Sequence, residues 1–172
     1  MRRAVRVRRS LQVRRRGAVA LAVLSSLGCQ RDLGAWHARL AAPEVRRLAG
    51  SWQLDLSATV MPPDSRPHAI GQIALTLNDE RLSAPGLGSP PVYFGTYDID
   101  FAPIGFSVGA LSGIPSVVGT LSSDSLTLIL APTSQTAATL HGVVHGDSIT
   151  GRWSMHHRAG VDAVGDFTLR RR

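Results

Sequence analysis

The sequence predicts an all-β domain, an antiparallel up-and-down meander barrel of about eight strands with a short helix before the first strand. Three observations predict it. Apolar and polar residues alternate with period two almost continuously after Gly50. A hairpin-forming segment occurs twice, and the connections between the alternating segments are short. A long meander closes or curls to hide its edge strands, which favours a small barrel.

The segment before the barrel, residues 29–48, is rich in alanine and arginine. We predict a tether followed by one or two helical turns over Glu44–Leu48. Pro43 precedes these turns and Gly50 ends them, as is typical of helix boundaries. The barrel domain is therefore expected to span residues 49–172.

The first three strands are predicted from alternation alone. In the third segment, Tyr93, Tyr97 and Phe101 face opposite to Asp98 and Asp100. One apolar face and one polar face indicate strands that are wetted on one side, which is typical of antiparallel sheets. The three segments are residues 52–57, 72–78 and 93–101.

The next four strands are predicted from an internal repeat. The segment 117–128 recurs 23 residues later as 140–151, and each copy contains a two-residue turn, Ser123-Asp124 or Gly146-Asp147. This register places the glycines at 119, 142 and 151 on the inner face, as in a strongly coiled sheet. A last strand follows at 165–170. The predicted pairs of the second hairpin are Val144 with Ile149, Gly142 with Gly151, and Leu140 with Trp153.

The first 28 residues have the composition of an export signal. Eight arginines precede an apolar segment, Gly17–Gly28, of 12 residues. A helix that crosses a bilayer needs about 20 residues, so this segment is predicted to be a cleaved signal peptide and not a membrane span.

The end of this segment resembles a bacterial lipoprotein signal. Gly28 and Cys29 match the lipobox, whereas Ser26 and Leu27 depart from it, and ordinary signal-peptidase cleavage is the alternative. The resemblance implies lipidation of Cys29, a membrane anchor through that lipid, and an exported protein of the cell envelope that faces the periplasm or the exterior. The segment Arg8–Leu11 also resembles part of a twin-arginine signal, so the export route stays open.

Charge and composition argue against a nucleic-acid-binding protein and against a disulfide-stabilised domain. Of the 19 basic residues, eight precede Cys29, which leaves 11 against 12 carboxylates in residues 29–172. A domain this close to neutrality has no phosphate-neutralising surface, so we expect no nucleic-acid partner. Because Cys29 is the sole cysteine, no intramolecular disulfide can stabilise the chain.

A second resemblance rests on Gly50-Ser51-Trp52 near the first strand and on the arginines that end the last strand. Together they are similar to the calycin group of lipocalin-like barrels, although the second lipocalin motif is not found. The resemblance implies that Trp52 plugs one end of the barrel and that a late arginine, Arg170, packs over it. Gly50, Trp52 and Arg170 would then be structural, and a small apolar ligand would bind in the barrel mouth.

The sequence contains three groups of residues that resemble catalytic or metal-binding motifs, but their spacing or surroundings do not fit those functions. His141 and His145 lie about 13 Å apart on a strand, too far to share an ion. The Gly-x-Ser-x-Gly motif at 105–109 lacks the helix that a hydrolase needs after its serine. Asp98 and Asp100, about 7 Å apart, match the wet side of a strand. We expect neither an enzyme nor a cofactor.

Three aromatic residues are the candidates for ligand binding: Tyr93, Tyr97 and Trp153. Inward tyrosines would add hydroxyl groups to an apolar lining, a combination typical of ligand pockets. The sequence therefore favours an envelope lipoprotein whose barrel binds or shields a small hydrophobic ligand. The alternative is a non-catalytic structural or protein-interaction module whose barrel is filled by side chains, with an unknown protein partner.

Overall fold

The structure is a computed structural model that describes residues 32–60, 67–84, 87–104, 116–131, 137–157 and 160–172. The predicted signal segment, Cys29 and the motif at 105–109 lie outside the described residues. The chain divides after Arg39 into two units, and the barrel belongs to the second, residues 40–172. Within the described ranges, no helix is both long and apolar enough to span a bilayer.

Two helical segments precede the first strand. Residues 32–41 are helical, which differs from the predicted tether, and α2 (Pro43–Arg46) follows. Alanine is the strongest helix former and accounts for the first helix, while Pro43 ends it and begins α2. The predicted short helix before the barrel is confirmed.

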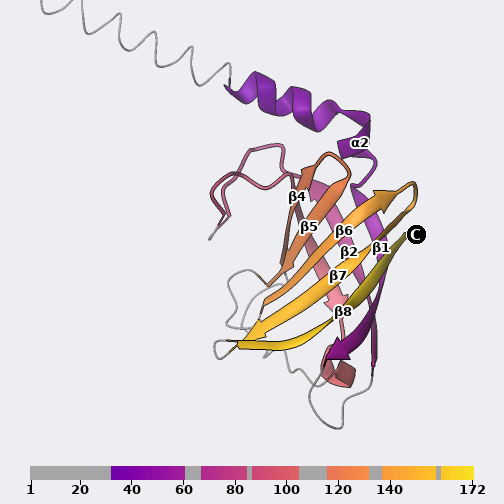
Figure 1. The fold of residues 1–172 in the computed structure, drawn as a ribbon. Coiled ribbons are helices and arrows are strands. Elements are labelled where there is room, and N and C mark those ends of the chain that lie inside the picture. Colours follow the sequence, from indigo (N-terminus) through magenta and orange to yellow (C-terminus); the bar gives the residue numbers. More distant parts are fainter. Residues whose placement is uncertain (1–31, 61–66, 85–86, 105–115, 132–136, 158–159) are drawn as a thin grey trace, which may run out of the picture. The chain divides into compact units, whose positions relative to one another are not determined.

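Eight antiparallel strands form a closed up-and-down barrel, which confirms the predicted fold class. Each strand pairs with the next along the chain, and β1 also pairs with β8 to close the sheet (Figure 1). The strands are β1 (Gly50–Val60), β2 (His68–Leu77), β3 (Tyr93–Ile99), β4 (Val117–Ser122), β5 (Ser125–Leu130), β6 (Ala137–His145), β7 (Ser148–His157) and β8 (Gly160–Arg171).

The strand register of the two hairpins is the predicted one. In the second hairpin, Val144 pairs with Ile149 and Leu140 with Trp153. Two-residue turns join β4 to β5 and β6 to β7, and their first residues, Ser123 and Gly146, have φ values of 53° and 60°. A left-handed φ suits glycine but is strained for serine.

Inward glycines allow the close approach of neighbouring strands and rings. A Cβ atom on Gly142 would lie 2.6 Å from the ring of Phe167, and one on Gly151 would lie 2.1 Å from the carbonyl oxygen of His141. The ring of Phe167 therefore takes up the space that a side chain at Gly142 would need. These contacts explain the glycines predicted for the inner face.

The structure departs from the predicted strand limits: β1 and β2 are longer than predicted, and β2 begins at His68, four residues early. β3 ends at Ile99, two residues early, and is followed by a turn of 3-10 helix, η1 (Ala102–Ile104). The backbone N–H of Ala102 donates to Asp100 Oδ1 at 2.9 Å, so this carboxylate turns the chain out of the sheet. β8 begins at Gly160, five residues earlier than predicted.

Candidate functional site

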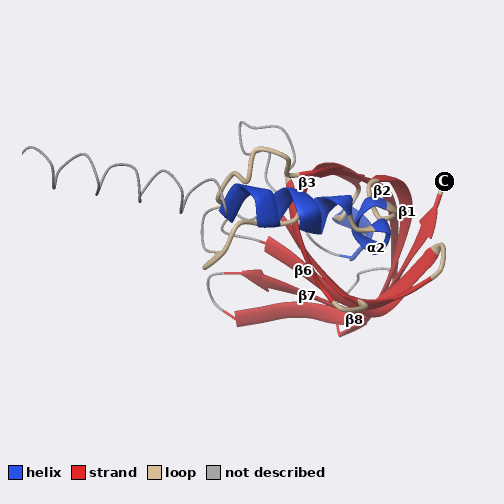
Figure 2. Cartoon of the chain, turned by 90° about the horizontal axis from the view of Figure 1, so that it is seen from above, coloured by secondary structure: helices blue, strands red, loops and turns tan. Residues whose placement is uncertain are grey.

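One end of the barrel is closed by α2. Seen from above, α2 lies inside the outline formed by the strands (Figure 2). The last carbonyl groups of a helix have no partner within the helix and need donors from elsewhere. Here three side chains of the barrel supply them. The donors are Trp52 of β1, Tyr93 of β3 and Arg171 of β8, and the acceptors are the carbonyl oxygens of Val45, Arg47, Leu48 and Ala49. We call this the plugged end.

Trp52 and Arg171 act together at the plugged end. The indole N–H of Trp52, which is 1% exposed, donates to the carbonyl oxygen of Leu48 at 2.9 Å. The guanidinium of Arg171 lies 5.6 Å from the centre of the Trp52 ring and donates to the carbonyls of Arg47 and Ala49. A cation near a helix C-terminus is also favoured by the helix dipole.

Gly50 joins α2 to β1 at the same place. Its φ of 123° is one that other residues rarely adopt, and a Cβ atom there would lie 3.3 Å from Arg171 Nη2. A side chain at this position would press against the guanidinium. The chain reversal and the arginine contact therefore both favour glycine.

Tyr93 of β3 contacts the same helix. Its side chain is fully buried, and its hydroxyl donates to the carbonyl oxygen of Val45 at 2.9 Å. Replacing that hydroxyl would leave the carbonyl without this donor in a buried setting, which is costly. Tyr93 thus belongs to the plug.

The arginine at the plugged end is Arg171 and not the predicted Arg170. Arg171 pairs with Trp52, whereas Arg170 pairs with Gln53 and Ser148 and is exposed on the outer face. The reason is the period of two along a strand, because Phe167 and Leu169 point inward and the next inward position is 171.

The other end of the barrel presents small side chains. Four strands place a buried alanine inward there, while Phe101 and Ile104, which follow β3, are also buried. Alanine leaves more space than the leucine and aromatic side chains that fill the rest of the interior. The four alanines are Ala58 of β1, Ala69 of β2, Ala138 of β6 and Ala163 of β8. We call this the alanine end.

Tyr97 is a half-buried residue of β3 nearer the alanine end. Its ring meets Phe101 edge to face, with ring centres 6.1 Å apart. Burial raises the pKa of its hydroxyl above the usual value for tyrosine. No hydrogen bond to this hydroxyl is found among the described residues, so Tyr97 can offer it to a bound molecule.

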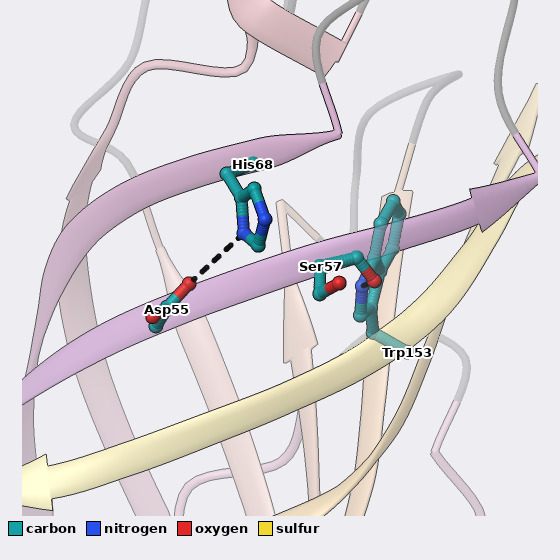
Figure 3. Close-up of polar contacts among 4 residues, drawn as sticks. All are labelled: Asp55, Ser57, His68 and Trp153. Atoms are coloured by element: carbon teal, nitrogen blue, oxygen red, sulfur yellow. Dashed lines mark hydrogen bonds and ion pairs between the residues drawn. The ribbon is translucent and has the colours of Figure 1, made fainter.

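Trp153 is 2% exposed and uses its indole N–H within the barrel, donating to the carbonyl oxygen of Ser57 at 3.2 Å (Figure 3). The three aromatic candidates therefore differ in their surroundings. Tyr93 lies at the plugged end, Trp153 is bonded to β1, and Tyr97 alone combines partial exposure with a hydroxyl that has no described partner.

The polar groups on the outer face do not form a metal site within the described ranges. His141 hydrogen bonds with the hydroxyls of Thr127 and Ser125 at 2.9 and 3.3 Å, and His145 lies further along the same strand. Asp98 is exposed on the polar face of β3, as its alternation predicts.

Two features of the site were not found by sequence reasoning. The alanine end was missed although its signal was present, because Ala58 continues the inward positions of Trp52, Leu54 and Leu56. The plug role of Tyr93 had no sequence signal, since it depends on where α2 packs.

Comparisons of the chain with protein-family models, with curated proteins and with solved structures gave no match. An eight-stranded barrel is compatible both with ligand binding and with a structural role, because its interior is just wide enough to be filled by side chains or to hold one small ligand.

Proposed function

We propose that this protein is a cell-envelope lipoprotein whose β-barrel binds or shields a small hydrophobic ligand at the alanine end. The observation that carries the proposal is the difference between the two ends of the interior. One end is occupied by Trp52, Tyr93 and α2, whereas the other is lined by four alanines. Any apolar space left beside these small side chains would favour an apolar guest over water.

Tyr97 fits the role of the polar group in such a site. Specific small-molecule sites are largely apolar and add a few polar groups that fix the orientation of the ligand. The rings of Tyr97 and Phe101 pack edge to face, and the tyrosine hydroxyl has no partner among the described residues. A ligand with one hydrogen-bonding group on an apolar body would match this lining. Tyr93 and Trp153 would contribute packing but not ligand hydrogen bonds.

The proposed location rests on the N-terminal sequence. Eight arginines, an apolar segment of 12 residues and Gly28-Cys29 follow one another in the order of a lipoprotein signal. Acyl chains on Cys29 would hold the protein at a membrane, because each buried methylene contributes about 0.8 kcal/mol. The barrel would act without catalysis, as a carrier or a shield.

The alternative function is a non-catalytic structural or protein-interaction module with a filled barrel. It is favoured by the packing of the interior, where Trp52, Trp153 and Phe167 are at most 3% exposed. In addition, no buried side-chain polar atom among the described residues lacks a hydrogen bond. In this alternative the partner would bind the outer face or the loops.

Native mass spectrometry of the protein taken from the membranes of the cells that make it separates these functions. The proposal predicts acyl chains on Cys29 and a retained small apolar molecule. A Cys29→Ser variant should lose the acyl mass and keep the ligand. Acylated protein without any ligand would support the structural module, and an unmodified Cys29 would refute the anchor.

A displacement assay tests the position of the ligand. The Ala138→Phe variant should fill the alanine end and weaken binding of an apolar fluorescent probe by roughly tenfold or more, about 1.4 kcal/mol. Ala137→Phe is the matched control, because residue 137 is the neighbour on the opposite face of β6. Equal probe binding by both variants would place the ligand elsewhere.

A further inference from the structure

The outer face of the barrel carries a groove of about 500 Å³ that shares one lining residue, Ala69, with the alanine end. It lies where β2 begins and where η1 packs against that strand. Its volume falls within the range of small-molecule sites, roughly 300–1,000 Å³. The groove is lined by Pro67, His68, Ala69, Ile70, Asp100 and Pro103.

One part of the groove is apolar and rigid. Ile70 is 61% exposed, an unusual setting for a large aliphatic side chain on a strand. Pro67 and Pro103 flank it from the two adjoining segments, and their rings have little conformational freedom to lose. An apolar body bound over Ile70 would remove this side chain from water at a low entropic cost.

The other part of the groove is acidic. Gly71 of β2 pairs with Ile99 of β3. Because the strands are antiparallel, Ile70, the residue before Gly71, lies across from Asp100, the residue after Ile99. Asp100 uses Oδ1 to accept the N–H of Ala102, which fixes the carboxylate at the wall of the groove and leaves Oδ2 for another partner. A charged carboxylate held in place beside an apolar surface favours a cation with an attached apolar group.

Further carboxylates lie on the strands next to the groove, which also favours a positively charged ligand. His68 also lines the groove, and its Nδ1 lies 3.7 Å from Asp55 Oδ1 (Figure 3). Asp55 and Asp98 are the charged outward side chains of β1 and β3, and these strands contain no arginine or lysine. Among the described residues, the groove itself is lined by one carboxylate and one histidine, and the arginine found on this face, Arg172, donates to Gln72, two positions along β2 from Ile70.

We propose that this groove is a second binding site and that its ligand is a small amphiphilic amine. The ammonium group would bind the carboxylate of Asp100, and the apolar part would lie over Ile70 and the two prolines. Because the site is on the outer face, it does not depend on the ligand proposed for the barrel interior.

Titration of the protein with octylammonium, followed by NMR, tests this site. Octylammonium should shift the resonances of Ile70 and Asp100, whereas octanoate should not, and octanol should bind more weakly. Asp100→Asn should weaken octylammonium binding roughly fivefold, as expected for one exposed ion pair. Asparagine can still accept the N–H of Ala102, so the start of η1 is kept.

Two matched controls make the test specific. Asp98→Asn removes an equal charge from the same polar face outside the groove and should change binding less than about twofold, since exposed charges are screened. Ala138→Phe should weaken probe binding in the interior roughly tenfold or more and leave octylammonium binding unchanged. Equal binding of octylammonium and octanoate, or equal effects of Asp98→Asn and Asp100→Asn, would overturn the proposal. So would the absence of any shift at Ile70.

Discussion

The two ends of the barrel are built from the same eight strands but with different classes of side chain. At the plugged end, Trp52, Tyr93 and Arg171 point their donors at the carbonyls that end α2. At the alanine end, four inward positions carry only a methyl group, and they lie among larger buried side chains such as Met155, which pairs with Ala138 and Ala163. Closing one end with α2 requires hydrogen-bond donors for the carbonyl oxygens that end the helix. A space for a ligand would require only small side chains. The same sheet therefore meets a helix terminus at one end and carries small inward side chains at the other.

The largest expected effect is at Trp52. Trp52→Ala should lower the free energy of unfolding by about 3–5 kcal/mol, because it removes a fully buried ring and the donor to Leu48. Tyr97→Ala, a truncation of a half-buried ring outside the plug, should cost less. Urea unfolding followed by circular dichroism measures both. Equal costs would remove the distinction between the two ends.

Removing only the hydroxyl group from each of the two tyrosines should give the next largest difference in stability. Tyr93→Phe should cost about 1–2 kcal/mol, since the carbonyl of Val45 loses the buried hydroxyl donor and keeps the N–H of Leu48. Tyr97→Phe should leave stability at neutral pH almost unchanged, because no described residue bonds its hydroxyl. The same unfolding experiment measures the difference. A larger loss for Tyr97→Phe would contradict the assignment of Tyr93 to the plug.

Consecutive arginines allow a similar comparison with a smaller effect. Arg171→Met should cost about 1 kcal/mol, because the contacts to α2 and to Trp52 are made at an exposed position. Arg170→Met, on the outer face, should have an effect near zero. Thermal unfolding of the two variants measures the difference. A larger loss of stability for Arg170→Met than for Arg171→Met would indicate that Arg170 is the arginine that contacts α2.

The smallest effect is the pH dependence that Tyr97 confers. Burial raises the pKa of Tyr97 in the folded protein above that of the unfolded chain. Its contribution to stability is therefore fully present below about pH 10 and is lost as the pH rises through the folded pKa. The Tyr97→Phe variant should lack this part of the alkaline decline. Unfolding curves at about pH 9 and 11 test it, and identical declines would contradict the burial of this hydroxyl.

Strand pairing could be predicted from sequence because it depends on local patterns. Alternation fixes which face of a strand is inward, and the two-residue turns fix the register, as in the pairing of Leu140 with Trp153. The same rule applied to β8 would have selected Arg171, since it shares its face with Phe167 and Leu169. Attention to the motif alone led to Arg170.

The features that escaped prediction depend on packing between segments distant in sequence. Tyr93 and Val45 meet only because α2 folds over the barrel end. The outer groove forms only because η1 turns back against β2, and alternation carries no information about that turn. The helix at 32–41 is a different case, because its alanine content was a helix signal that we assigned to a tether.

The most direct test of the account is NMR of alanine methyl groups in the presence of a spin-labelled apolar ligand. The account predicts strong line broadening at Ala58, Ala69, Ala138 and Ala163. The side chains of Trp52 and Tyr93 should stay sharp, because α2 closes their end. Broadening concentrated at the plugged end, or no broadening at any of these methyl groups, would contradict it.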